Sequence, residues 1–135
     1  MSDFNFNWKG KRVLITGHTG FKGTWLCLWM QLLSVQVHGY ARVPPTRPNL
    51  HELTGAAADM ESIIGDIRDL DLLQATFDRV QPEIVFHLAA QPIVQIAYED
   101  PVETFSTNMM GTVNVLECAR RTPSVRSVVV VTSDK

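Results

Sequence analysis

The sequence predicts an α/β fold with a doubly wound parallel sheet, and three observations support this. Short apolar runs rich in Val and Ile alternate along the chain with longer amphipathic stretches. Three glycines spaced three residues apart, Gly17, Gly20 and Gly23, follow the first apolar run. With 135 residues, 45% of them hydrophobic, the chain has the size and apolar content of one ordinary domain.

Five segments are expected to be strands. The first is "RVLIT" at residues 12–16, which is short and rich in β-branched side chains. The others are "VQVHGY", "SIIGD", "EIVFHLAA" and "RSVVVVTSDK", at residues 35–40, 62–66, 83–90 and 126–135. Because continuous runs of Val and Ile are typical of strands covered on both faces, we expect helices on both sides of the sheet.

Helical patterns separate these strands. Residues 21–33 and 70–80 have helical length and composition, and a long helix is expected within residues 102–121. Strand–helix–strand order with connections of this length implies parallel strands. The prediction is therefore a Rossmann fold. Since the sequence stops at Lys135, right after the fifth strand, we expect the fold to be truncated there.

The glycines predict a phosphate cradle between the first strand and the first helix. Gly17 can adopt the backbone conformation of a tight turn, Gly20 lets a ligand approach the main chain, and Gly23 lets the helix pack close to the sheet. The N–H groups at the start of the helix then favour an anion. Glycines also mark ordinary turns, but this position in an alternating fold favours a dinucleotide cofactor.

Composition and charge indicate which classes of partner the protein binds. The net charge of -2, with both signs interspersed, favours a small molecule over nucleic acid or an anionic membrane. The most apolar stretch, residues 25–33, is far shorter than the ~20 residues of a membrane span. The N-terminus lacks the order of a secretory signal, so a cytoplasmic protein is expected. Cys27 and Cys118 belong to no metal-binding cluster, so we expect no metal and no disulfide.

Five motifs carry a family resemblance: "TGHTGFKG", "GDIRD", "PEIVFHLAAQP", "STNMMGTVNVLE" and "VVVTSDK". Over nearly its whole length the chain resembles the extended short-chain dehydrogenase/reductase family, and within it the enzymes that dehydrate nucleotide sugars. The resemblance implies a lyase that uses NAD on a nucleotide sugar and is a homo-oligomer when intact. Residues 1–135 would then be the N-terminal part of the NAD-binding domain, without the sugar-nucleotide-binding domain.

The resemblance also implies a set of cofactor-binding residues. Gly17, Gly20 and Gly23 would line the pyrophosphate, with Phe21 and Lys22 in the same turn. Asp66 and Ile67 would meet the adenine, the Asp66 carboxylate accepting from its amine. The stretch after the fourth strand would pass the ribose, and Asn108 would be the asparagine of the active site. That stretch consists of Leu88, Ala89, Ala90 and Gln91.

Catalysis would fall to Ser133, Asp134 and Lys135 in the "TSDK" stretch. By resemblance, Ser133 holds an oxygen of the substrate, Asp134 is the dehydration acid, and Lys135 stands where sister dehydratases have glutamate. The family's YxxxK pair is absent, because neither Tyr40 nor Tyr98 has a lysine four residues later. We therefore expect that pair further along an intact enzyme.

The cofactor prediction is NAD, with NADP as the close alternative. An acidic residue about 20 residues beyond the glycines usually binds the ribose 2′-OH of NAD, whereas an arginine accommodates the 2′-phosphate of NADP. The sequence there reads "GYARVPP", with Arg42 and no acid. The arginine favours NADP, but the family resemblance favours NAD.

Other interpretations remain open at this stage. The chain could belong to an epimerase or a GDP-mannose-type dehydratase, or be a non-catalytic dinucleotide-binding module. His18 is expected in the turn near phosphate, His87 in the core, and Trp25 and Trp29 against the sheet. An apolar stripe on the last helix suits either a dimer interface or the core. The stripe consists of Val102, Phe105, Met109, Val113 and Leu116.

Overall fold

Five strands form one parallel sheet in the order β3-β2-β1-β4-β5. The structure is a computed structural model that describes residues 7–132. The strands are β1 (Arg12–Thr16), β2 (Gln36–Ala41), β3 (Glu61–Ile64), β4 (Ile84–His87) and β5 (Ser127–Val130). The doubly wound parallel sheet predicted from the sequence is therefore confirmed.

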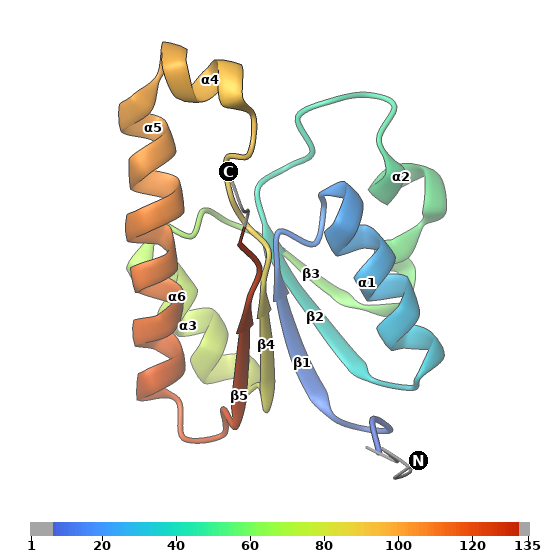
Figure 1. Ribbon diagram of the computed structural model, residues 1–135. Coiled ribbons are helices and arrows are strands. Elements are labelled where there is room, and N and C mark those ends of the chain that lie inside the picture. Colours follow the sequence, from blue (N-terminus) through green and yellow to red (C-terminus); the bar gives the residue numbers. More distant parts are fainter. Residues whose placement is uncertain (1–6, 133–135) are drawn as a thin grey trace, which may run out of the picture.

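Helices cover both faces of the sheet. Figure 1 shows α1 and α2 on one side of it, and α3 and the long helix that ends as α6 on the other. The helices are α1 (Phe21–Leu32), α2 (Leu50–Thr54), α3 (Leu70–Val80), α4 (Val94–Glu99), α5 (Pro101–Phe105) and α6 (Gly111–Arg121), with a short 3₁₀ helix η1 (Ala56–Asp59). The two-layer cover explains why the central strands contain so few polar residues.

Strand β1 is buried on both faces. Leu14 points into the core formed with α3 and α6, where it joins Phe77 and Val115. Its neighbours Val13 and Ile15 point the other way, into the core shared with α1. This alternation follows from the two-residue period of a strand. Because both faces are apolar, β1 lies in the middle of the sheet and anchors the turn that follows it.

The carboxyl ends of β1 and β4 form the switch point of the sheet. In the strand register Thr16 lies beside Tyr40 of β2 and beside His87 of β4. From β1 the chain crosses to β2 on one side, whereas β4 lies on the other side of β1. In open parallel sheets, ligands bind in the crevice at such a point. The loops after β1 and β4 are therefore the expected position of a ligand site.

The long helix contains a widened turn. Residues Ser106–Met110 form a π-helical turn, η2, between α5 and α6. At the next residue, Gly111, a Cβ atom would lie 2.3 Å from Cδ1 of Ile67, so the buried Ile67 side chain occupies the space that a side chain there would need. The sequence predicts a helix here but not the π turn, which has no distinctive residue pattern.

Several elements differ from the sequence-based expectation. The fourth strand spans only Ile84–His87, and the residues that follow form a loop. Helices α2 and α4 are not predicted from the sequence, because each is too short to show an apolar period. Trp25 and Trp29 are 54% and 61% exposed, so they do not pack α1 against the sheet. Across residues 7–132, no helix has the length and apolar character needed to cross a bilayer.

Candidate cofactor site

The first glycine of the turn after β1 holds two strands together. Gly17 has φ +76°, a conformation that favours glycine, and a Cβ atom there would lie 2.7 Å from the backbone nitrogen of Ala89. The Gly17 N–H donates to the carbonyl of Tyr40 on β2 at 2.9 Å. The turn therefore lies against the loop after β4 and is fixed to the end of β2.

The other two glycines have opposite surroundings. A Cβ atom at Gly23 would lie 2.1 Å from the carbonyl oxygen of Gly17, so α1 starts in direct contact with the turn. At Gly20 the same construction meets only the Gly17 oxygen, at an ordinary 3.4 Å. Gly23 therefore serves packing, and Gly20 leaves open space on the side where a ligand can approach the main chain.

The start of α1 is an exposed site for an anion. Gly20 is the N-cap and offers no side chain, and no acidic residue stands in the first turn. The first N–H groups of a helix have no partner within the helix and carry partial positive charge. The side chains of Phe21 and Lys22 are exposed beside them. A hollow of about 320 Å³ adjoins this turn, lined by Thr19, Gly20, Phe21, Pro44, Pro45, Thr46, Pro48, Asn49 and Leu50.

His18 is a structural residue and not an exposed one. Its side chain is 0% exposed, its Nε2 lies 2.6 Å from Oγ of Ser62 on β3, and its ring fills the space that a Cβ on Gly39 would need. Burial, with a smaller effect from His51, lowers the pKa of His18 to about 4. As expected, His18 lies in the turn, but its neutral ring points into the fold and anchors the turn from inside.

Asp66 and Ile67 follow β3 and have different environments. Asp66 accepts from the backbone N–H and the guanidinium of Arg68, and these bonds hold the pKa of its carboxyl below the usual range. Ile67 is 4% exposed and lies in the core, where its carbonyl accepts from Asn114 at 3.0 Å. Asp66 is therefore an ionised group at the edge of the crevice, and the Ile67 side chain is part of the fold beneath it.

Asn108 fixes the loop that follows β4. Its Oδ1 accepts from the Gln91 N–H at 2.8 Å, and its Nδ2 donates to the Gln91 carbonyl at 3.0 Å. The Gln91 side chain donates to Oγ1 of Thr104 at 2.9 Å and accepts from the Ile93 N–H. The amide of Asn108, in the π turn, therefore bonds both the N–H and the carbonyl of Gln91, as a neighbouring strand would. These two bonds hold the backbone of the loop in place.

The same loop is exposed to different degrees along its length. Leu88 and Ala89 are half-buried, and Ala90 is exposed. The Leu88 N–H continues the sheet by donating to the carbonyl of Thr16 at 3.1 Å. The predicted ribose-binding stretch therefore begins as an extension of β4 beside the glycine turn.

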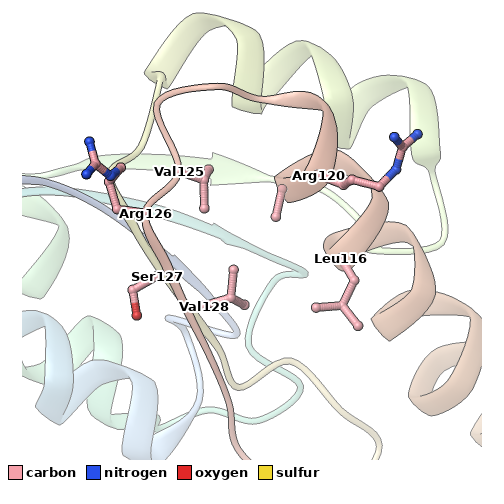
Figure 2. A pocket seen from close by; sticks show the side chains of 7 residues that line it. Leu116, Arg120, Val125, Arg126, Ser127 and Val128 are labelled. Carbon is pink, nitrogen blue, oxygen red and sulfur yellow. The ribbon is translucent and has the colours of Figure 1, made fainter.

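Ser133, Asp134 and Lys135 lie outside the described residues. In the part that is described, a further hollow of about 270 Å³ lies between α6 and the start of β5. Figure 2 shows Leu116, Val125 and Val128 around it. Because it lies where β5 begins, it is remote from the carboxyl ends of the strands and is not the cofactor crevice.

Residues 7–132 contain no cluster of three His, Cys, Asp or Glu side chains suited to a metal ion, and Cys27 and Cys118 are buried free thiols.

Sequence reasoning missed the partners of the predicted residues. Arg68 binds Asp66, and Glu103 of α5 binds both Arg68 and Arg42. Thr112 of α6 contacts the buried His87. "GDIRD" contains the arginine beside the aspartate, but no local signal indicates that Glu103, 61 residues after Arg42, lies opposite it.

Comparisons with known proteins agree with this geometry. The family model for GDP-mannose 4,6 dehydratase matches residues 14–134. The CDP-glucose 4,6-dehydratase of Salmonella typhimurium is 53% identical over 135 residues, which cover 100% of this chain and 37% of that protein. The GDP-mannose 4,6-dehydratase of Vibrio cholerae is 33% identical over 82% of this chain and 31% of that protein. The chain thus spans about a third of the length of these relatives.

A solved structure gives the same fold. UDP-glucose 4-epimerase of Thermus thermophilus, solved in complex with NAD, superposes with a TM-score of 0.76 and 29% identity. The match covers 87% of this chain and 36% of the epimerase. The match of the family model to residues 14–134, with a relative 53% identical over the whole chain, places the sequence in a family: the chain belongs to the GDP-mannose 4,6 dehydratase family.

Proposed function

We propose that this chain forms the cofactor-binding part of an NAD-dependent dehydratase that converts CDP-glucose into CDP-4-keto-6-deoxyglucose and water. The observation that carries the proposal is the 53% identity to a CDP-glucose 4,6-dehydratase over every residue of the chain, including the glycine turn. We expect such an enzyme to be cytoplasmic, because NAD and nucleotide sugars are soluble metabolites.

The described residues suit a dinucleotide. Gly20 leaves open space at the N-terminus of α1, where the pyrophosphate would lie. Phe21 and Lys22 are exposed beside it. Asp66 would accept from the adenine amine, and residues 88–91, held by Asn108, would pass the ribose. A bound NAD would supply the hydride acceptor for oxidation at C4 and the hydride donor for reduction at C6.

The chemistry on the sugar is proposed for the residues of "TSDK". Once C4 is a ketone, the proton on C5 becomes acidic, and loss of the C6 hydroxyl requires a proton donor. Asp134 donates that proton, so the hydroxyl leaves as water. Lys135 helps to move the C5 proton, and Ser133 holds the oxygen on C4. The proton that the C4 hydroxyl loses on oxidation would pass to the tyrosine of the YxxxK pair, which we expect further along an intact enzyme.

The test uses the protein at its natural full length with NAD and CDP-glucose deuterated at C4. The proposal expects a product lighter by one water, with deuterium at C6. Product of unchanged mass, inverted at C4, would indicate instead the epimerase alternative, which is favoured by the likeness to UDP-glucose 4-epimerase. GDP-mannose and UDP-glucose serve as competing substrates. Turnover of either in preference to CDP-glucose would overturn the choice of nucleotide sugar.

We also propose that the enzyme is a homo-oligomer that associates through the long helix. Val102, Phe105, Met109, Val113 and Leu116 are all exposed large apolar residues. Their helical spacing places them along one face of the segment that runs from α5 to α6. The exposure of this stripe within residues 7–132 supports an interface rather than a core position. A second copy of the chain offers an apolar partner of the same shape.

A further inference from the structure

A carboxylate from α5 reaches the end of β2. Oε1 of Glu103 lies 3.0 Å from a guanidinium nitrogen of Arg42, which directly follows β2, and Oε2 accepts from Arg68 in the loop after β3. Arg68 in turn binds Asp66. Two arginines and two carboxylates therefore form a chain over the carboxyl ends of β2 and β3. Glu103 is its central link.

Local structure explains why Glu103 can reach so far. It is the third residue after the N-cap Asp100, a position where a glutamate usually bonds back to the N–H of the cap. Here the Asp100 N–H already donates to the carbonyl of Ile96 at 2.7 Å, at the end of α4. Asp100 still caps the Glu103 N–H at 2.9 Å. The carboxylate of Glu103 is thus released from its local partner and extends to the arginines.

The ordinary NAD site has an acid at the end of β2, which binds the ribose 2′-OH and repels a 2′-phosphate. In this chain Arg42 and Val43 stand there instead. We propose that Glu103 supplies, from α5, the negative charge that other NAD sites carry on β2, and that it makes this site select NAD over NADP. This inference rests on the proposed dinucleotide cofactor.

The charged side chains at this edge of the sheet explain why NAD would be preferred over NADP. Arg42 is 64% exposed on its side chain and would be the natural partner of a 2′-phosphate, whereas Glu103 is 28% exposed and already holds it. A 2′-phosphate adds about two negative charges to this group of two arginines and two carboxylates, whose own charges cancel. It must compete with Glu103 for Arg42 and is repelled by the same carboxylate, since like charges placed together at a binding site are costly. The ribose hydroxyl of NAD meets no such repulsion.

The experiment measures the affinity of the full-length protein for NAD and for NADP by calorimetric titration, without substrate. The wild-type protein should bind NAD more tightly. Glu103→Gln keeps the shape of the side chain and removes its charge, so NADP should gain affinity over NAD by about tenfold or more. Glu99→Gln is the matched control, because this exposed glutamate lies on neighbouring α4 and bonds Gln95. It should leave the NAD to NADP ratio unchanged.

Arg42→Ala tests the other half of the pair. In the Glu103→Gln background it should abolish the gain for NADP, because Arg42 is the group that would pair with the 2′-phosphate. The inference is overturned if the wild-type protein prefers NADP. It is also overturned if Glu103→Gln and Glu99→Gln have the same ratio of NAD to NADP affinity. Binding of neither dinucleotide by wild type would overturn the proposed function as well, and with it this inference. Selective NAD binding that survives Glu103→Gln would overturn the inference alone.

Discussion

Thr112 of α6 lies against His87 of β4, with its Oγ1 2.9 Å from Nε2 of the buried ring. The Thr112 hydroxyl donates its one hydrogen to the carbonyl of Asn108 at 2.7 Å, so Nε2 of His87 must carry the hydrogen that Thr112 accepts. The other ring nitrogen then accepts from Thr16 at 2.6 Å, and burial lowers the pKa of His87 to about 4. A neutral histidine thus links β1 to the π turn that holds Asn108.

Thr112→Val should weaken this link. The substitution keeps the shape of the side chain but leaves Nε2–H of His87 buried without its acceptor, which costs about 1–3 kcal/mol in the free energy of unfolding. Denaturant unfolding measures it. Thr76→Val is the control, because Thr76 is also buried and also donates to the carbonyl four residues before it, at 2.9 Å. Equal losses in the two variants would contradict a special role for the His87 contact.

Substitutions at Gly23 and Gly20 should affect different properties, the first stability and the second NAD affinity. Gly23→Ala places a methyl group 2.1 Å from the Gly17 oxygen and should destabilise the fold by at least about 2 kcal/mol. Gly20→Ala meets no such obstacle and should change stability by less than about 0.5 kcal/mol. Its methyl group fills the open side of the turn, so the affinity for NAD should fall about tenfold. Unfolding curves and NAD titrations measure the two effects. Unchanged NAD affinity in a folded Gly20→Ala protein would argue against the pyrophosphate position.

The strands and the glycine turn are predictable from sequence because their signals are local. The β-branched run of β1 and the spacing of Gly17 and Gly23 are determined within a few residues of one another. The inward position of His18 is not, since it depends on Ser62 and on the missing side chain of Gly39. The contact of Glu103 with Arg42 is also non-local and joins two elements across the edge of the sheet. Sequence reasoning therefore predicted the glycine turn but not the contacts that Glu103 makes with Arg42 and Arg68.

Stability should fall as the pH drops from 7 to 5. Burial lowers the folded-state pKa of both His18 and His87 from 6.5 to about 4, so the unfolded chain binds protons in this range and the folded chain does not. Their contribution is present above pH 6.5 and is lost as the pH falls toward 4, by roughly 2 kcal/mol for each histidine at pH 5. The hydrogen bonds from Arg68 hold the pKa of Asp66 below its usual range, so this group acts only at lower pH.

Urea unfolding of the full-length protein at pH 7, 6 and 5 measures this dependence. His87→Gln removes one of these groups, so its stability should change less over the same range than that of wild type. A wild-type stability that does not change between pH 7 and 5 would show that the two rings are not kept neutral by the fold.

The apolar stripe on the long helix should control association. Val113→Glu places a charge in the middle of the exposed face and should convert the oligomer into monomer, because burying an unpaired carboxylate is costly. Sedimentation or light scattering of the full-length protein measures the mass. Leu53→Glu is the control, since Leu53 is an exposed leucine on α2, away from the stripe. An oligomer that tolerates Val113→Glu as well as Leu53→Glu would place the interface elsewhere.

Asp134→Asn should separate the two halves of the proposed reaction. The asparagine cannot donate the proton that C6–OH needs, so C4 oxidation should continue while water loss slows by about 100-fold or more. Reduced cofactor should then accumulate, which its absorbance reports in a single turnover. Loss of both steps together would instead indicate a structural defect, and dehydration at the native rate would transfer the acid role to Lys135.

Lys135→Met tests how the acid keeps its proton. A nearby ammonium lowers the pKa of a carboxyl group and so opposes the role of a proton donor. If Asp134 is the acid, removing the charge should raise that pKa and extend dehydration to higher pH, even where the maximal rate falls because the C5 proton moves less readily. If Lys135 is the acid, the variant should lose dehydration at every pH. The pH dependence of the dehydration rate in Lys135→Met therefore identifies which of the two groups donates the proton.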